Sequence, residues 1–392
     1  MLPFVRMLEY GNVIPKGATP VDFFLDVSSG KPTMLMLLDN GEVWGCSNNG
    51  QLLGRNSTAA AYGKPYFVME NVKLMFASVW GTLLITNDNK VKYTGRQAMF
   101  NGSSNYWGTF QDFTSKYTSA GIDISTIEKV AFNTGTLFIR TTNGDVWGHG
   151  DNANGYFGKG NTVGNFTPTI VRTGTLNFWL TNSNAVVQTG PKEFYATGDN
   201  YYYQMGVTTA GNITSWTQIF KNATDDPEFE YNAMRTSQAT LILYGKGTTF
   251  YASGRNFMSA WGVSGAPVNV NTTMYKGTLP FVPGDLSYFL AGREQAYWTN
   301  LIIDNNGVLY IAGTKDGGGS SNALTFEVLP TPSSAVGFKC GTATRSYAIM
   351  DCTGNQFMYA CGSTLSDPAG FTPLSTPLPH VWTHITDFKF DR

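Results

Sequence analysis

Hydrophobic residues in this chain fall in short runs separated by turns rich in Gly, Asn and Asp. Residues 127–132 alternate apolar and polar positions, which predicts a strand. Residues 137–141 are more continuously apolar, as suits a second, interior strand, and Asn143-Gly144 then predicts a hairpin with a type I′ turn. A third strand is predicted from residue 145 and a fourth over 166–171, at an edge, where its proline is tolerated. No long stretch has the helical period of 3.6.

The same order of strand, hairpin, aromatic residue and glycine recurs from one end of the chain to the other. Its spacing of about fifty residues is typical of propeller blades. We therefore predict an all-β fold, a seven-bladed β-propeller of four-stranded antiparallel blades. Residues 1–24 are predicted to form an N-terminal arm and 25–392 the propeller, with 381–390 as a closing strand that pairs with N-terminal residues. The aromatic anchors of the seven copies are Trp44, Tyr93, Trp147, Tyr195, Tyr251, Tyr310 and Tyr359.

The repeated aromatic and glycine are interpreted as structural positions. A residue without Cβ allows close approach of two backbones, and an aromatic ring between sheets buries a large apolar area. These residues are therefore excluded from the candidate site.

Charge and composition narrow the classes of partner. The formal net charge is −1 and charged residues make up only 14% of the chain, so neither nucleic acid nor an anionic membrane is expected as a partner. No apolar run has the length of a membrane span, and the first residues do not have the pattern of a signal peptide. A neutral surface rich in Asn, Thr, Gly and aromatics is typical of secreted or virion proteins. We expect synthesis in a host cytoplasm without export.

The sequence contains no recognisable catalytic motif, and no cofactor or metal is expected. His149 lies inside a repeat and is interpreted as structural. His380 and His384 are four residues apart, but the surrounding residues alternate like a strand, so surface histidines are favoured over a zinc site. The acidic segment 225–230 lacks the spacing of a calcium loop. Among the four cysteines, Cys46 and Cys361 occupy matching repeat positions, and free thiols are favoured over a disulfide.

Departures from the repeat are where recognition is expected, since loops on a rigid scaffold commonly carry function. The segments that vary most are 97–125, 207–231, 263–278, 315–321 and 363–379. Aromatic residues with Ser, Asn and Gly resemble adaptable binding loops and also suit stacking on sugars. The residues predicted to contact a partner are Phe100, Tyr106, Trp107, Tyr201, Tyr202 and Trp261.

Residues 130–158 resemble the repeat of the regulator-of-chromosome-condensation family. The segment Gly50-Gln51-Leu52-Leu53-Gly54 is similar to that family's Gly-Gln-Leu-Gly turn, and Tyr203-Gln204-Met205-Gly206 is a weaker copy. The resemblance covers about residues 25 to 392 and implies a seven-bladed propeller. The family's frequent histidine before the inner strand is missing, because Thr82 and Thr136 stand near that place.

The same resemblance implies two classes of activity, since the family includes guanine-nucleotide exchange factors for a small GTPase and bacterial propellers that cap enzymes. The chain has no basic tail for chromatin and no identifiable wedge for exchange. Our leading prediction is a non-enzymatic binding protein, a component of a tailed-bacteriophage virion on the tail or collar. Its expected partners are other virion proteins and a host cell-surface protein or glycan. The alternatives are a bacterial propeller that blocks an enzyme, and a carbohydrate-active lyase or hydrolase.

Overall fold

The fold is seen in a computed structural model, which divides into two compact units: 1–96 with 105–115 and 335–392, and 97–104 with 116–334. From residue 329 onward the structure describes only the backbone. The described residues are 18, 20–26, 33–47, 49–58, 61–221, 226, 228–236, 239–256, 259, 261–284, 299–306, 308–314, 322–328, 338–342, 346–351, 358–362 and 378–384.

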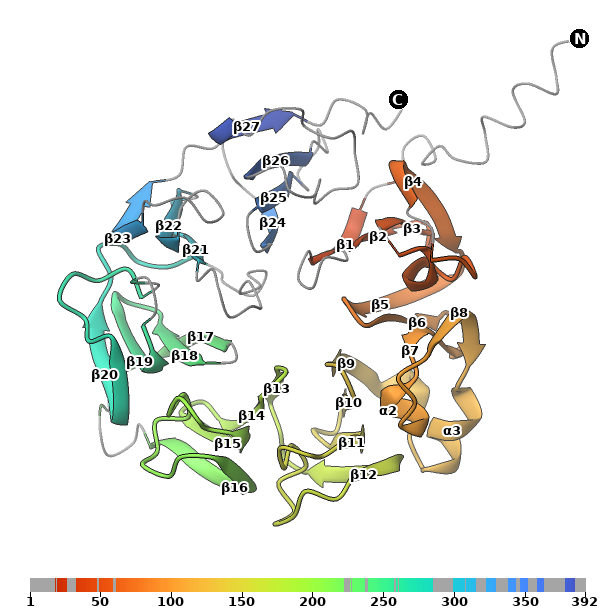
Figure 1. Cartoon of the computed structure of the whole chain (residues 1–392), viewed down its shortest axis with the longest axis horizontal. Coiled ribbons are helices and arrows are strands. Elements are labelled where there is room, and N and C mark those ends of the chain that lie inside the picture. Colours follow the sequence, from red (N-terminus) through yellow and green to blue (C-terminus); the bar gives the residue numbers. More distant parts are fainter. Residues whose placement is uncertain are drawn as a thin grey trace, which may run out of the picture. The chain divides into compact units, whose positions relative to one another are not determined.

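The first unit contains three antiparallel four-stranded sheets, each with its strands in chain order (Figure 1). The inner strands β1 and β24 of its first and last sheets lie next to each other. Along the chain, the short helix α2 (Ala98–Asn101) lies between the third and fourth strands of the second sheet, and the short helix α3 (Thr114–Ser119) follows the fourth strand. The strands are β1 (Pro20–Asp26), β2 (Thr33–Leu38), β3 (Val43–Ser47) and β4 (Ala61–Met69); β5 (Val72–Ser78), β6 (Gly81–Thr86), β7 (Val91–Arg96) and β8 (Tyr106–Asp112); and β24 (Phe338–Thr342), β25 (Ser346–Asp351), β26 (Met358–Gly362) and β27 (Leu378–His384).

The second unit contains four further antiparallel sheets, again with strands in chain order. Three of them have four strands, and the described part of the fourth has three. The strands are β9 (Ile127–Phe132), β10 (Thr136–Thr141), β11 (Val146–Gly150) and β12 (Asn165–Arg172); β13 (Asn177–Leu180), β14 (Asn184–Gly190), β15 (Glu193–Asp199) and β16 (Asn212–Lys221); β17 (Tyr231–Thr236), β18 (Thr240–Gly245), β19 (Thr249–Arg255) and β20 (Asn269–Thr278); and β21 (Thr299–Ile303), β22 (Leu309–Thr314) and β23 (Asn322–Val328).

The seven sheets confirm the seven repeats predicted from the aromatic anchors, because each anchor lies in the strand that follows its sheet's central hairpin. The second sheet contains a one-residue slip. Gly95 pairs with Gly81 two residues after Tyr93, whereas Gly150 pairs with Thr136 three residues after Trp147. Tyr93 therefore has the register position at which several other sheets have a small residue. It is fully buried, and its hydroxyl donates to the carbonyl of Arg96 at 2.9 Å.

The repeated glycine is required by its backbone conformation as well as by space. Gly150 and Gly254 have φ of 108° and 87°, in the left-handed region that favours glycine. A Cβ on Gly254 would lie 2.2 Å from the carbonyl oxygen of Ala239, which is backbone and cannot move aside. The predicted steric role of this glycine is confirmed.

The predicted hairpin at Asn143-Gly144 is present but is not a type I′ turn. Only Gly144 has positive φ, and its N–H donates to the carbonyl of Thr141 at 2.9 Å. The turn is closed by a single left-handed residue, as in a type I turn followed by a bulge. The hydrogen-bonding side chain of Asn143, which accepts from the N–H of Asp145, favours this turn.

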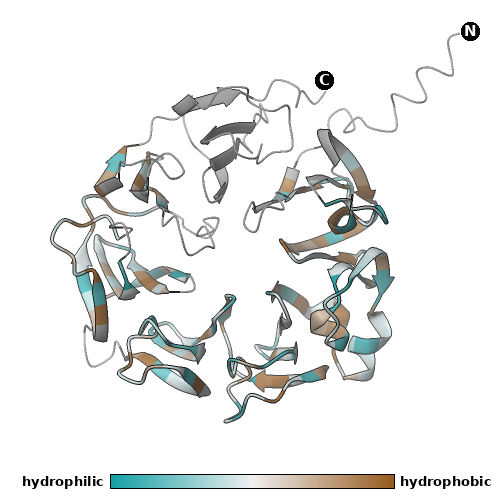
Figure 2. Cartoon of the chain, in the orientation of Figure 1, coloured by the Kyte–Doolittle hydropathy of each residue, from teal (hydrophilic) through white to brown (hydrophobic). Residues whose placement is uncertain are grey.

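Three of the segments predicted as variable excursions contain regular strands. Segments 97–125, 207–231 and 263–278 include β8, β16 and β20, the outer strands of their sheets. Of these strands, β16 and β20 are rich in Thr and Asn, and hydrophobic and hydrophilic stretches both appear along β20 (Figure 2). The apolar pattern that identified the inner strands is therefore weak in them. Segments 315–321 and 363–377 lie outside the described residues.

Hydrophobic cores lie between sheets that follow one another in the chain. Phe194 of β15 and Leu243 of β18 belong to one buried cluster, and Phe138 of β10 and Phe178 of β13 belong to another. These sheets of the second unit therefore bury faces against their neighbours in sequence, which is how a short sheet gains enough apolar contact to be stable.

The two ends of the chain differ from the prediction. Residues 20–24 of the predicted arm lie in β1, which pairs with β2. The described part of the predicted closing strand belongs to β27, which pairs with β26 as an ordinary outer strand, not with N-terminal residues. The remaining arm and residues 385–390, like the side chains of Cys46 and Cys361, lie outside the described part of the chain. His380 and His384 lie on a strand, as predicted.

Candidate partner-binding site

The turn that follows the third strand of several sheets is built around a buried asparagine. Asn152, Asn200 and Asn256 each accept, through the side-chain oxygen, the N–H of the residue five positions later at 2.9 Å. The amide nitrogen of Asn200 also donates to the carbonyl of Thr209 at 2.6 Å. One side chain thus holds both sides of the loop. These asparagine side chains are buried, and their hydrogen bonds hold the loop against the sheet.

A second repeated contact fixes four of the described turns or helices to the next sheet. A side chain on the third strand of one sheet donates to a backbone carbonyl of the turn or helix that follows the third strand of the sheet before it. We call these contacts the inter-sheet bonds. Each measures 2.7 Å, and they join Thr94 to Gln51, His149 to Met99, Thr197 to Gly155 and Ser253 to Gln204.

The most exposed aromatic side chain at such a turn is Tyr201, with 66% of its surface exposed. Its ring lies edge-on to Tyr202, with centroids 4.9 Å apart, and the guanidinium of Arg255 lies 4.3 Å from the centre of the Tyr202 ring. Arg255 comes from β19 of the next sheet. We call Tyr201, Tyr202 and Arg255 the tyrosine platform.

The backbone beneath the platform is well determined by hydrogen bonds. The N–H of Tyr201 donates to the carboxylate of Asp199 at 2.8 Å, and the N–H of Tyr202 donates to the side-chain oxygen of Gln204 at 3.1 Å. Gln204 is fully buried and its amide donates to the carbonyl of Asp199 at 2.6 Å. Tyr203 has φ of 56°, a conformation uncommon for a residue other than glycine. The exposed ring of Tyr201 and the half-buried ring of Tyr202 therefore stand on a rigid turn, which lowers the entropy lost when a partner binds.

Tyr106 and Trp107, also predicted as contact residues, lie on β8 and are half-buried. Trp107 packs against Phe113 and Tyr93, with ring centroids 5.1 and 6.1 Å apart. Part of the Trp107 ring is thus used in the packing of its own sheet.

Phe100 and Trp261 are corrections to the predicted contact set, because both are buried. Trp261 is 1% exposed, stacks on Tyr275 at 5.7 Å and donates its indole N–H to the hydroxyl of Thr240 at 2.9 Å. It occupies the apolar position of the repeated turn. Phe100, 5% exposed, packs on the ring of His149 at 5.2 Å. Aromatic residues that follow a turn signal can face either way, and burial here favours the core.

His149 has the structural role predicted for it. Its Nδ1 lies 2.7 Å from the carbonyl of Met99, which can only accept, so Nδ1 carries the proton. Nε2 then accepts from the hydroxyl of Tyr117 at 3.1 Å. Burial, with a smaller effect of the positive charge of Lys116, lowers the pKa of His149 to about 3. The imidazole is therefore neutral at ordinary pH and satisfied on both sides.

The acidic segment 225–230 contributes a structural contact. Asp226 accepts from the hydroxyl of Tyr251 and from the ammonium of Lys276, both at 2.6 Å. These bonds lower the pKa of the Asp226 carboxyl. Within the described residues, no group of three or more His, Cys, Asp and Glu side chains is arranged to hold a metal ion. None of the described helices has the length and hydrophobicity of a membrane span.

Arg255 is the one member of the platform that the sequence did not indicate. It follows the repeated Gly254 at the end of β19, in a different sheet from Tyr202. Only the packing of adjacent sheets brings the two together. The sole signal in the sequence is its position directly after the repeated glycine. Arg96 has the equivalent position in its own repeat, and its guanidinium lies near the ring of Trp80.

Comparison with known proteins identifies the fold through structure alone. No protein-family model matches the sequence, and no curated protein is similar enough to be a relative. The structure is similar to human WBSCR16, with a TM-score of 0.63 and 14% identity over 88% of this chain and 94% of that one. It is also similar to Prp20p from Saccharomyces cerevisiae, described together with its binding to Gsp1p and histones. That match has a TM-score of 0.60 and 14% identity, and covers 86% of this chain and 82% of that one.

These likenesses show the fold, since the sequences share so few residues. They agree with the seven antiparallel sheets and with the repeated turn that resembles the regulator-of-chromosome-condensation repeat. The chain therefore has an all-β, seven-bladed propeller fold of the kind found in RCC1-like proteins.

Proposed function

We propose that this propeller is a non-catalytic binding protein and that the tyrosine platform is part of its contact surface. The observation that carries the proposal is the exposed ring of Tyr201 beside the half-buried ring of Tyr202, on a turn held by buried side chains. Tyrosine offers a large, rigid contact area with a polar end, and interfaces are enriched in Tyr and Arg. The platform supplies both residue types from two neighbouring sheets.

The finer proposal is a virion component of a tailed bacteriophage, which contacts a host cell-surface protein or glycan through the platform. It is supported by the near-zero net charge, the low content of charged residues and the abundance of Asn, Thr and aromatic residues. The proposed site in the particle is the tail or collar, beside other virion proteins. Tyr106 and Trp107 remain proposed as further contacts.

The second candidate is a propeller that binds and blocks a protein such as an enzyme. The structural neighbours favour it in one respect, because two of them are described with protein partners: Gsp1p and histones for Prp20p, and Kap60 for yeast RCC1 (Prp20). A rigid platform that presents tyrosine and arginine suits a protein surface as well as a glycan.

Binding of the fluorescently labelled protein to a panel of intact bacteria separates these proposals. Host attachment predicts binding to some strains only. Protease treatment of the cells abolishes binding to a protein receptor, and periodate treatment abolishes binding to a glycan. If no strain binds, the finer proposal fails and capture of a soluble protein partner becomes the next test.

The variant Tyr201→Ala tests the platform itself. Because Tyr201 is two-thirds exposed, its removal should leave the melting temperature unchanged while it weakens binding about tenfold or more. The matched control is Val163→Ala, which truncates a side chain that is 72% exposed elsewhere on the same unit. Equal loss of binding in both variants, or in neither, would remove the platform from the proposal.

A further inference from the structure

An open cleft of about 540 Å³ lies between the outer strand of one sheet and the following sheet of the second unit. Its walls come from the end of β12, from the hairpin that joins β14 to β15, and from β15 and β16. Sites for small molecules typically have volumes of roughly 300 to 1,000 Å³. The residues that line the cleft include Arg172, Thr189, Glu193, Tyr195 and Trp216.

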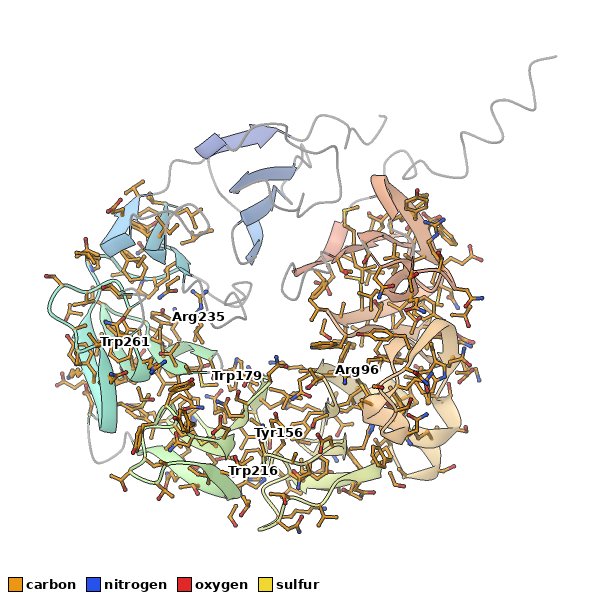
Figure 3. All side chains as sticks on the ribbon, in the orientation of Figure 1. Arg96, Tyr156, Trp179, Trp216, Arg235 and Trp261 are labelled. Carbon is orange, nitrogen blue, oxygen red and sulfur yellow. The ribbon has the colours of Figure 1, made fainter. Side chains whose placement is uncertain are left out.

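Trp216, labelled in Figure 3, gives the cleft a fixed aromatic wall. Its indole N–H donates to the carbonyl of Val171 on β12 at 3.0 Å, which holds the ring against the neighbouring sheet. Gly158 makes room for it, because a Cβ there would lie 2.3 Å from the indole nitrogen. The side chain remains half-exposed, so its ring is held in place and still accessible.

Two oppositely charged side chains line the cleft and keep unused hydrogen-bonding capacity. Glu193 is exposed and accepts only the hydroxyl of Thr189, at 3.2 Å, among the described residues. The guanidinium of Arg172 lies 4.4 Å from the centre of the Tyr195 ring. No acceptor or carboxylate of the described residues bonds to Arg172. The cleft therefore offers donors on one side chain and acceptors on another, beside an aromatic ring.

This combination selects a class of ligand. An anion would be attracted by Arg172 but repelled by Glu193, and a cation would meet the reverse. A neutral polyhydroxyl molecule can accept hydrogen bonds from the guanidinium, donate to the carboxylate and lay its C–H face on an indole ring. We propose that the cleft binds one sugar unit of a neutral glycan. This goes beyond the proposed function, since none of the platform residues lines the cleft.

Titration of the ¹⁵N-tryptophan-labelled protein with D-glucose, D-galactose and N-acetylglucosamine tests the proposal. We expect at least one sugar to shift the indole N–H resonance of Trp216 in a saturable way, with that resonance assigned by its loss in Trp216→Phe. If no sugar shifts it, or if glycine or acetate shifts it as strongly as any sugar, the proposal is wrong.

Variants then connect the binding to the charged pair. Glu193→Gln and Arg172→Gln should each weaken sugar binding about tenfold or more, since hydrogen bonds to charged groups are the strong ones. Glu230→Gln is the matched control, because Glu230 is an exposed glutamate of the same unit, paired with Lys246 at 3.3 Å, and does not line the cleft. Unchanged affinity in both cleft variants, or an equal loss in the control, would overturn the assignment.

The failure of this proposal can be told apart from the failure of the proposed function. Tyr201→Ala should leave sugar titration unchanged, because Tyr201 does not line the cleft. A protein that binds sugar but no bacterial cell would contradict host attachment alone. A protein that binds cells, but whose Trp216 resonance does not respond to any sugar, would contradict only the proposed sugar site in the cleft.

Discussion

Several buried polar side chains in this protein complete hydrogen bonds with the backbone. His149, Asn152 and Asn200 are nearly or wholly inaccessible, and each bonds to backbone groups that no strand pairing satisfies. A buried carbonyl or N–H without a partner costs about 1 to 3 kcal/mol. These side chains therefore stabilise the irregular turns between strands, and substitutions at them should affect stability before any contact surface.

The depressed pKa of His149 makes stability depend on pH. In the unfolded chain the imidazole has its ordinary pKa of 6.5, against about 3 when folded, so below pH 6.5 the unfolded state binds the proton preferentially. The contribution of the neutral His149 to the free energy of unfolding is therefore fully present above about pH 6.5. It falls toward pH 3, by up to ~1.4 kcal/mol per pH unit. Urea unfolding at about pH 7.5 and pH 4.5 should show a loss roughly 2 to 3 kcal/mol larger in the wild type than in His149→Gln.

A direct measurement guards against a His149→Gln variant that does not fold. The Cε1 proton of His149 should show no titration between about pH 8 and pH 5 in the native wild-type protein. A histidine resonance assigned to His149 that titrates near its ordinary pKa would contradict the buried, neutral imidazole.

At the scale of elements, the third strand of four of the sheets does two jobs. It pairs within its sheet and, through the inter-sheet bonds, holds the turn of the sheet before it. The residues that donate differ in type, from threonine to serine to histidine, while the accepting group is a backbone carbonyl in every case. A repeat can therefore vary in sequence at this position and keep the same contact.

The inter-sheet bond of Thr197 can be tested alone. Its hydroxyl lies 2.7 Å from the carbonyls of both Gly155 and Ile213, and the residue is fully buried. Thr197→Val keeps the shape but leaves a buried carbonyl without its donor, so we expect a loss of about 1 to 3 kcal/mol in urea unfolding. Thr208→Val, at an exposed turn position, should change stability by less than ~0.5 kcal/mol. Equal effects would show that the hydroxyl of Thr197 contributes little.

At the scale of the whole molecule, the seven sheets share one arrangement of strands, and the outer strand β27 completes the last sheet. The last sheet ends with β27, which pairs with β26 through Tyr359 and His384, Ala360 and Thr383, and Gly362 and Leu378. This outer strand is the only cover on the hydrogen-bonding edge of β26 within the described sheet.

Removal of residues 378–392 should therefore expose the edge of β26. An unpaired strand edge is a template for pairing with another chain. We expect the truncated protein to self-associate in size-exclusion chromatography with light scattering and to melt at a lower temperature. Monomeric behaviour with an unchanged melting temperature would indicate that β27 does not protect this edge. Removal of Leu2, Pro3 and Phe4, which leaves every described strand intact, is the control.

The sequence by itself determined the number of repeats and the inner strands, because apolar periodicity, turn residues and the repeated glycine are local signals. Residues 127–132 were predicted as a strand with the bounds that the structure gives β9. The same signals missed the outer strands β16 and β20, whose Thr- and Asn-rich patterns do not distinguish a strand from a loop.

Which side chains are exposed was decided only by the tertiary structure. Tyr201 directly follows the buried asparagine of one repeated turn and is exposed, whereas Trp261 lies five residues after the asparagine of another and packs with residues of the next sheet. Arg255 approaches Tyr202, and Arg172 and Glu193 line one cleft, only because adjacent sheets pack face to face. Contacts of this kind join residues far apart in the chain, and no local pattern of the sequence encodes them.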